Sequence, residues 1–286
     1  MHEQLSDIPA DVIDRFHLDR LPFSQTMMRP DELMSLSGKR ALVTGGGCGD
    51  LGQAIVHRLA AVGAHTAVLD IDGQAAETVA KEATDRWDAD VFALAGDVTD
   101  WDGIHAAVAT AAERMGGLDI LVNNAGIRGR LMPLAEMDDD AFEEVIDINL
   151  RSVYRCMRAQ LAPLYARGGG SIVNVASATM FGVSAGLAPY AASKMGVVGL
   201  SKVASKEAGP HGVRVNVVAP GRTDTPLFRS HAGGDSPEDA AALVAPIPLG
   251  RFADPMELAQ AIVFLCSDRA SFITGSTLVV DGGRTG

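Results

Sequence analysis

The sequence predicts an α/β protein built on a doubly wound parallel sheet of about seven strands, with helices on both faces. Two observations carry this prediction. Short β-branched runs alternate with helical stretches along the chain, which is the pattern of a parallel sheet with crossover helices. A glycine-rich turn joins the first of these runs to the first helix, as in folds that bind a nucleotide at a strand–helix junction.

The elements follow in order from residue 40. Residues 40–44 form the first expected strand and residues 45–52 the glycine turn; the next helix has Ile55, Leu59 and Val62 on one face and ends at Gly63. The remaining strands are expected at residues 65–69, 90–95, 118–123, 170–176, 213–218 and 277–280. Helical stretches fill the intervals, and residues 168–170 indicate a helix stop rather than a linker.

The glycine turn predicts a dinucleotide site, because a strand, a glycine turn and a helix place a pyrophosphate on backbone N–H groups. The second strand is followed by Asp70, from which a carboxylate accepts hydrogen bonds from ribose hydroxyls and repels a 2′-phosphate. The turn contains no Arg or Lys, Cys48 stands where a basic residue would lie, and Ile71 follows Asp70. These residues favour NAD over NADP. The alternative is that Asp70 only caps the following turn.

Tyr190 is the strongest candidate for acid–base chemistry. Lys194 follows it by four residues, so on a helix that begins near Pro189 the two side chains lie on one face. A nearby cation favours the charged form of an acid, so Lys194 is expected to lower the pKa of Tyr190 from its ordinary value of about 10. The helix N-terminus adds to that effect. Such a phenol exchanges a proton with an alcohol or a ketone at neutral pH.

Ser177 stands at the end of an expected strand, thirteen residues before Tyr190. A hydroxyl at the carboxyl end of a parallel strand faces the crevice in which ligands bind. We therefore expect Ser177 to hold a substrate oxygen while Tyr190 transfers the proton. A serine here also serves commonly as a helix cap or turn residue, and that alternative stays open.

Taken together, these motifs resemble the short-chain dehydrogenase/reductase family, in its shorter single-domain branch, over residues 40–283. The motifs that carry the resemblance are Thr44-Gly45 with Gly49, Asp97-Val98, Asn123-Asn124-Ala125-Gly126, Asn149, Ser177, Tyr190 with Lys194, and Pro220-Gly221 with Thr225. One departure is an extra residue in the glycine turn, which gives the spacing Gly47-x-Gly49-x-x-Gly52 of other dinucleotide-binding proteins.

The resemblance implies a Rossmann-type fold, an enzyme, and a set of roles. The catalytic residues would be Asn149, Ser177, Tyr190 and Lys194, with Asn149 holding a water in a proton relay and Lys194 also binding the nicotinamide ribose. Asp97 and Val98 would hold the adenine, Asn123 to Gly126 would shape the sheet edge, and Thr223 and Thr225 would contact the nicotinamide end. The full set expected to bind NAD is Gly45, Gly49, Asp50, Leu51, Asp70, Asp97, Val98, Asn123, Gly126, Tyr190, Lys194, Pro220, Gly221, Thr223 and Thr225.

Composition excludes several other classes of protein. A net charge of −12 without a basic cluster argues against nucleic acid or an anionic membrane as partner. No apolar run reaches the length of a membrane span and the N-terminus lacks the pattern of a signal peptide. The three cysteines have no CxxC spacing and the seven His no metal spacing, which predicts free thiols, a cytoplasmic location and no metal. Cys48 is either an oxidation-sensitive point or simply a small residue filling the turn.

Two divisions of the chain are expected. Residues 1–38 form an N-terminal extension, in which residues 9–18 suit a short amphipathic helix. This extension is a docking arm, a lid or a poorly ordered tail, and docking is favoured because apolar residues need cover. Residues 39–286 form one dehydrogenase domain with a substrate loop at about 222–250, typical of a mobile lid.

The predicted function is NAD-dependent interconversion of a secondary alcohol and its ketone, with polyols and sugars as the favoured small-molecule substrates. The alternatives are a 3-oxoacyl thioester reductase and, less favoured, a catalytically silent NAD-sensing protein. A sugar-nucleotide epimerase of the longer branch would need a larger C-terminal domain than follows Pro220. The resemblance also implies a homotetramer, with a homodimer as the alternative. Arg128 and Arg130 are candidates for holding a substrate carboxylate or hydroxyl, although such arginines more often lie at a surface or interface.

Overall fold

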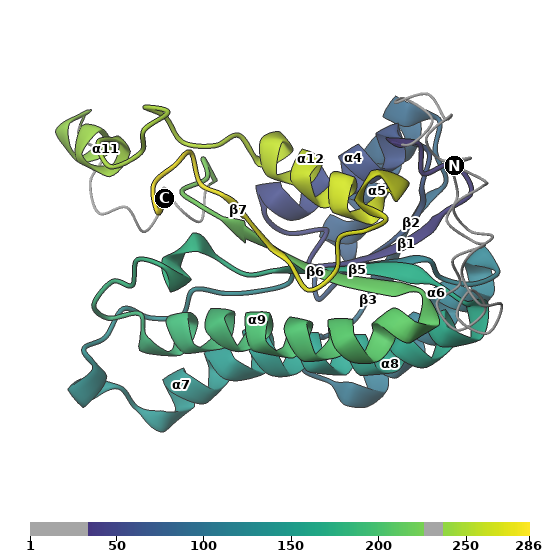
Figure 1. Ribbon diagram of the computed structural model, residues 1–286, viewed down its shortest axis with the longest axis horizontal. Coiled ribbons are helices and arrows are strands. Elements are labelled where there is room, and N and C mark those ends of the chain that lie inside the picture. Colours follow the sequence, from purple (N-terminus) through teal and green to yellow (C-terminus); the bar gives the residue numbers. More distant parts are fainter. Residues whose placement is uncertain (1–33, 226–236) are drawn as a thin grey trace, which may run out of the picture.

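A seven-stranded parallel sheet forms the centre of the computed structural model, which describes residues 34–225 and 237–286 (Figure 1). The strand order is β3-β2-β1-β4-β5-β6-β7, and every neighbouring pair is parallel. The predicted doubly wound sheet is confirmed. The strand order reverses between β1 and β4, so the ligand crevice is expected outside the carboxyl ends of these strands.

The strands lie close to their predicted positions. They are β1 (Arg40–Thr44), β2 (His65–Asp70), β3 (Val91–Ala95), β4 (Ile120–Asn123), β5 (Gly170–Val175), β6 (Val213–Pro220) and β7 (Thr277–Val280). The predicted bounds miss most at the start of β4 and the end of β6. At these two positions the pairing with the neighbouring strand determines the bounds. Strand β4 begins where Ile120 pairs with Ala41, and β6 continues until Pro220 pairs with Val280.

Helices cover both faces of the sheet (Figure 1). They are α4 (Asp50–Ala61), α5 (Gly73–Trp87), α6 (Trp101–Met115), α7 (Asp139–Ile146), α8 (Ser152–Arg167), α9 (Ala188–Ala208), α11 (Pro237–Val244) and α12 (Pro255–Cys266). Short 3₁₀ turns are η3 (Leu134–Glu136), η5 (Ala178–Met180), η6 (Gly209–His211) and η7 (Asp268–Ala270). In Figure 1, α4, α5 and α12 lie on one face, and α6, α8 and α9 on the other. As predicted, α8 ends at Gly168, whose φ of 77° is left-handed.

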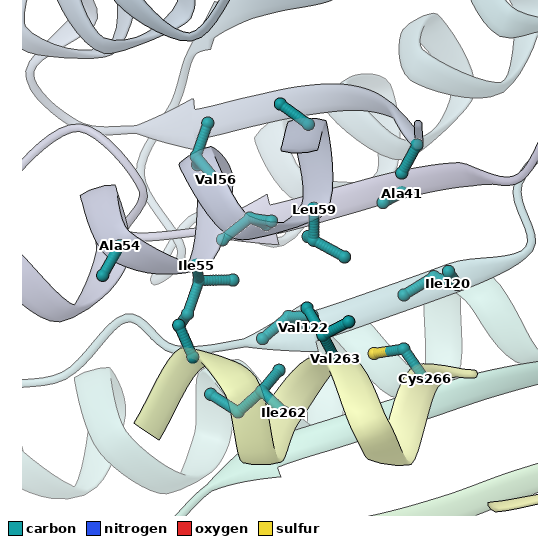
Figure 2. Close-up of a cluster of buried hydrophobic side chains, with 14 of the residues drawn as sticks. Ala41, Ala54, Ile55, Val56, Leu59, Ile120, Val122, Ile262, Val263 and Cys266 are labelled. Atoms are coloured by element: carbon teal, nitrogen blue, oxygen red, sulfur yellow. The ribbon is translucent and has the colours of Figure 1, made fainter. Parts of the chain in front are cut away.

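The core consists of one apolar layer on each face of the sheet. Figure 2 shows Ile55 and Leu59 of α4 and Ile262 of α12 directed toward the strands on one face, and all three are fully buried. A second cluster packs β-strand residues such as Leu121 against Val197 and other residues of α6, α8 and α9. Because both faces are covered, the strands consist of continuous apolar runs rather than alternating ones.

The helical stretch expected between β4 and β5 is interrupted. One π-helical turn, η4 (Asp147–Arg151), separates α7 from α8 and contains the fully buried Asn149. Such turns are rare and occur frequently at functional sites. The irregularity therefore marks the position of a predicted catalytic residue.

Some expectations fall outside the described residues. The helix expected at residues 9–18 lies there, as do residues 226–236 of the expected substrate loop. The rest of that loop includes α11, and Leu249 is bonded through its N–H to the Gly282 carbonyl at 3.2 Å. The division of the chain at residue 39 stays a prediction. Over residues 34–225 and 237–286, no helix is both long enough and apolar enough to cross a bilayer.

Candidate active site

Ser177, Tyr190 and Lys194 meet where β5 ends. The chain leaves β5 at Val175, and Ser177 then caps η5 by accepting a hydrogen bond from the Thr179 N–H at 3.2 Å. Helix α9 begins at Ala188, with a proline in its first turn that suits that position. Tyr190 and Lys194 therefore lie one turn apart at the start of α9, as predicted. The cap also shows that the alternative reading of Ser177, as a helix-capping residue, holds alongside its place in the site.

Lys194 is a buried cation without a carboxylate partner among residues 34–225 and 237–286. Lys194 is 5% exposed, and its ammonium donates a hydrogen bond to the Val175 carbonyl at 3.0 Å. The Nζ atom lies 5.8 Å from the centroid of the Tyr190 ring. Burial lowers the pKa of Lys194 to about 8, because a low-dielectric environment disfavours the charged form. At neutral pH the side chain is still mostly charged.

The expected direction of the Tyr190 pKa shift is wrong. Burial raises the pKa of Tyr190 above 10, and the opposing effects of a hydrogen bond with Ser177 and the charge of Arg128 are smaller. Sequence spacing places Lys194 on the same helical face but says nothing of how deeply the phenol is buried. Desolvation therefore outweighs the neighbouring charges.

Asn149 fastens the segment after β4 to the start of α9. Its side-chain oxygen accepts the Ile127 N–H at 2.8 Å, and its side-chain nitrogen donates to the Ile127 carbonyl at 2.8 Å. The same nitrogen lies 3.2 Å from Ser193 Oγ, and Ser193 Oγ donates to the Tyr190 carbonyl at 2.8 Å. Sequence reasoning missed Ile127 and Ser193. The side-chain amide is largely occupied by protein, so the predicted water relay stays a prediction.

The close approach of these groups requires Gly126. A Cβ at this position would lie 3.1 Å from Asn149 Oδ1 and 3.3 Å from Lys194 Nζ, closer than most real contacts of a Cβ. Gly126 therefore lies against the catalytic groups, at the carboxyl end of β4.

Asp70 is bonded to the glycine turn itself. Its Oδ2 accepts the N–H groups of Gly47 at 2.8 Å and Cys48 at 2.9 Å, and its Oδ1 accepts the Asp72 N–H at 3.1 Å. The last bond is the turn cap that was the alternative reading. A carboxylate offers about four lone-pair sites, so the 4% exposed Asp70 retains capacity for a ligand hydroxyl. Gly47 and Cys48 direct their N–H groups to Asp70 rather than to a phosphate.

The turn packs tightly between β1 and α4. A Cβ on Gly52 would lie 2.0 Å from the Gly45 carbonyl oxygen, so only glycine fits this helix–strand contact. The side chain of Asn124, a functional position that sequence reasoning left without a role of its own, donates to the Gly45 carbonyl at 2.8 Å. By helix geometry the first N–H groups of α4 have no acceptor within the helix. These belong to Asp50, Leu51 and Gly52 and are the free donors of the turn.

The other residues expected to bind NAD are placed as follows. Asp97 accepts the Thr99 N–H at 2.7 Å and Val98 packs against the second core cluster, both after β3. Asn123 is 2% exposed and donates to Asn174 at 2.7 Å, so its side chain supports the sheet edge. Gly49 precedes α4 with a φ of 80°. Pro220, Gly221, Thr223 and Thr225 follow one another at the end of β6, and Thr223 bridges to Ala253.

The segments that follow β4 and β5 carry exposed apolar side chains. Four that come from the segments after β4 and β5 are more than half exposed: Leu131, Leu134, Phe181 and Val183. A backbone hydrogen bond of 3.2 Å from Met132 to Gly186 ties these two segments together. Of the two candidate arginines, the exposed Arg130 pairs with Asp138 at 2.9 Å, whereas Arg128 lies closer to Tyr190 and influences its pKa.

The thiols and potential metal ligands form no further centre in the described part of the chain. Cys48 is exposed, Cys156 and Cys266 are buried, and all three are free. Burial and the charge of Asp70 raise the pKa of Cys48, so its thiol is not activated. Among the described residues no group of three or more His, Cys, Asp or Glu side chains is arranged to hold a metal ion.

Comparison with known proteins gives consistent results. The family model described as enoyl-(acyl carrier protein) reductase matches residues 49–285. The chain is 42% identical over 255 residues to a 2,5-dichloro-2,5-cyclohexadiene-1,4-diol dehydrogenase of Sphingobium indicum, covering 88% of this chain and 99% of that one. It is 40% identical over 245 residues to a cis-4-hydroxycyclohexanecarboxylate dehydrogenase of Sinomonas cyclohexanicum, covering 86% and 96%.

Solved structures agree with these relatives. Levodione reductase superposes with a TM-score of 0.84 at 32% identity, covering 87% of this chain and 98% of that one. A 3-ketoacyl-(acyl-carrier-protein) reductase from Brucella melitensis, complexed with NADH, superposes with a TM-score of 0.81 at 35% identity, covering 88% and 100%. The fold, the matched length and these identities establish that the chain belongs to the short-chain dehydrogenase/reductase family, whose members here are oxidoreductases acting on alcohol or ketone groups.

Proposed function

We propose that this protein is an NAD-dependent oxidoreductase that interconverts a secondary alcohol and its ketone, with Tyr190 as the acid–base group. The observation that supports this proposal best is the placement of Ser177, Tyr190 and Lys194 together beyond the end of β5, in the crevice where such sheets bind ligands. The same crevice contains the glycine turn.

The residues of the turn fit a dinucleotide. Gly52 permits a helix–strand contact that a Cβ would block, the N–H groups of Asp50, Leu51 and Gly52 point from a helix N-terminus, and Asp70 presents a buried carboxylate. Bound there, NAD supplies the acceptor or donor of a hydride. The residues that would hold it are those expected from the sequence, with Asn123 acting through the sheet edge.

The protein's own groups handle the oxygen and its proton. Ser177 would donate a hydrogen bond to the substrate oxygen, and Tyr190 would take the hydroxyl proton as the alcohol becomes a ketone, or return it in the other direction. Burial raises the pKa of Tyr190, so positive charge must favour phenolate during the reaction. Lys194 and Arg128 supply part of that charge from the protein. Asn149 positions Tyr190 through Ser193.

A ring alcohol suits the site better than the polyols and sugars favoured from the sequence. Exposed Leu131, Phe181 and Val183 offer apolar surface to the substrate rather than hydrogen bonds to several hydroxyls. Two relatives are named for ring alcohols, a cyclohexadienediol and a hydroxycyclohexanecarboxylate. The second candidate is a 3-oxoacyl thioester reductase, which the NADH complex of a 3-ketoacyl carrier-protein reductase favours.

A homotetramer remains part of the proposal. Tyr154 on α8 and Met195 and Val203 on α9 are about half exposed, which is apolar surface suited to a second copy. Light scattering of the purified protein tests this, and a monomer would contradict it.

The function is tested by measuring NADH or NADPH formation with cyclic alcohols, polyols, hydroxy acids and 3-hydroxyacyl thioesters. The proposal predicts turnover of a cyclic secondary alcohol with NAD and at most weak turnover with NADP. Turnover with NADP alone would contradict the role given to Asp70. Turnover confined to thioesters would establish the second candidate instead.

A further inference from the structure

Arg128 is a partly buried cation with no neutralising partner in the part of the chain that the structure describes. It directly follows Ile127, whose N–H and carbonyl are both held by the Asn149 side chain at 2.8 Å. The backbone at Arg128 is therefore fixed at the carboxyl end of β4, beside the catalytic groups. Within residues 34–225 and 237–286, Arg128 forms no hydrogen bond, ion pair or ring contact.

Two other arginines, Arg130 and Arg151, are paired with carboxylates. Arg130, two residues further on, pairs with Asp138 at 2.9 Å although it is exposed, and Arg151 pairs with Glu143 at 3.2 Å. Withdrawing a guanidinium from water without giving it an anion is unfavourable. Among the described residues Arg128 has no such anion, so its five N–H donors are available to a ligand.

The segments near Arg128 carry apolar side chains, which indicates the chemistry of the uncharged part of the ligand. The segment that carries it continues to Leu131 and Met132, and Met132 is bonded to Gly186 two residues before α9. A Cβ on Gly186 would lie 3.4 Å from a methyl group of Leu131, so Leu131 closes against the segment that leads to Tyr190. Exposed Phe181 and Val183 lie in the same segment between β5 and α9. The walls are apolar, and Arg128 adds one positive charge.

Arg128 also lies close to the reacting oxygen. Its positive charge acts on the Tyr190 phenol and opposes the larger effect of burial, which raises the pKa of Tyr190. An anion bound by Arg128 is therefore part of the same molecule whose hydroxyl or carbonyl reaches Tyr190, provided that the molecule is small.

We propose that Arg128 is the specificity-determining residue of this site and binds a carboxylate on an otherwise apolar ring substrate, so that the protein acts on cyclic hydroxy or oxo acids. A guanidinium recognises a carboxylate through two parallel hydrogen bonds, while Leu131 and Phe181 cover the ring. This inference rests on the proposed function and names the substrate class of that site.

The test compares acids with neutral analogues of the same shape. The substrates are the cis and trans isomers of 3- and 4-hydroxycyclohexanecarboxylate, each against its methyl ester, with NAD. Wild-type protein is expected to favour at least one acid over its ester, and Arg128→Met to lower kcat/KM for that acid by about 10- to 100-fold, mainly through KM, with little change for the ester. Arg130→Met, in the same segment, serves as the control and stays within about twofold of wild type.

A binding measurement separates this inference from the proposed function. Cyclohexanecarboxylate and cyclohexanecarboxamide are titrated calorimetrically into protein saturated with NADH, and NADH affinity is measured by fluorescence. Carboxylate binding that exceeds carboxamide binding and disappears in Arg128→Met supports the assignment even where no alcohol is turned over. Equal binding of the two compounds overturns it. So does weaker NADH binding in Arg128→Met, because Arg128 would then serve the cofactor.

Discussion

Cations near the two ends of the central strands differ in whether they have a partner within the protein. At the amino ends, Arg40 binds Asp119 through two nitrogens at 2.7 and 2.9 Å, and Arg167 reaches the same carboxylate at 3.2 Å. Arg214 donates to the Leu265 carbonyl at 2.7 Å. Burial alone would raise the pKa of Asp119, but the bonds and charge of Arg40, with the charge of Arg167, hold it below 3.8. These charges are used within the fold.

Two cations near the carboxyl ends, Lys194 and Arg128, lack a carboxylate partner among the described residues. Lys194 has one carbonyl partner, and Arg128 has none within the described part of the chain. A cavity of about 490 Å³ lies at the amino ends, lined by Lys39, Asp119, Arg167 and Arg214 among others. Its size does not mark the reaction, because most of its charged groups are already paired.

Replacing Lys194 should give the largest separation between function and stability. Lys194→Met is expected to lower kcat by about 10²-fold or more because the phenol loses its cation, yet to unfold at a higher temperature than wild type. With a folded-state pKa of about 8 against 10.5 when unfolded, the buried charge costs about 1–3 kcal/mol of folding stability below pH 8.

The sign of this effect follows from proton binding. Between pH 8 and 10.5 the unfolded protein binds more protons at Lys194 than the folded protein does, so the free energy of unfolding of wild type rises with pH over that range. The stability advantage of Lys194→Met should shrink accordingly. Lys202→Met, an exposed lysine on the same helix, is the control. A variant that is less stable than wild type at pH 7 would contradict the account.

Removing the charge of Asp119, at the amino ends of the strands, should lower stability and leave activity unchanged. Asp119→Asn is expected to lower the free energy of unfolding by about 2–3 kcal/mol, since Arg40 and Arg167 lose their common partner, and to leave kcat unchanged. Because the folded-state pKa of Asp119 lies below 3.8, its stabilising contribution is present above that pH and is lost as pH falls below it. Urea unfolding at pH 7 and at pH 3 measures both.

The exposed pair of Glu143 and Arg151 provides the matched control for Asp119. Glu143→Gln breaks an ion pair of 3.2 Å between side chains that are 58% and 42% exposed, which is worth at most about 1 kcal/mol. If Asp119→Asn destabilises the protein no more than Glu143→Gln does, the charges at the amino ends are not structural.

The smallest expected effect is at Asp70. Asp70→Asn removes the charge that we propose faces the ribose and weakens the bonds to Gly47 and Cys48, so the dissociation constant of NADH should rise about tenfold. The preference for NADH over NADPH should become smaller, because the variant no longer repels a 2′-phosphate. Fluorescence titration with both cofactors measures this. Asp72→Asn, which alters only the cap of α5, should change neither affinity.

The sequence predicts those features of the fold and the site that depend on the spacing of residues a few positions apart. The strand, glycine turn and helix from Arg40 to Ala61 and the Tyr190–Lys194 pair follow from periodicity over a few residues, and the fold followed from repetition of such units. Contacts between distant segments were not predictable in this way. Asn149 binds a backbone 22 residues away, and Asp70 binds a turn 23 residues away.

Burial accounts for the one expectation that had the wrong direction. The pKa of Tyr190 depends on how the segments after β4 and β5 close around the phenol, and no spacing rule contains that information. The substrate is subject to the same limit, because the segments that carry Leu131 and Phe181 are joined by a backbone bond between Met132 and Gly186, which are far apart in the sequence.

The most direct test of the account is the rate of NADH formation by Tyr190→Phe, with NADH binding measured in parallel. Phenylalanine preserves the ring and removes only the hydroxyl. The account predicts that kcat falls by about 10²- to 10⁴-fold while NADH binds as tightly as to wild type. A variant that retains a substantial share of wild-type turnover would contradict it, because another group would then transfer the proton.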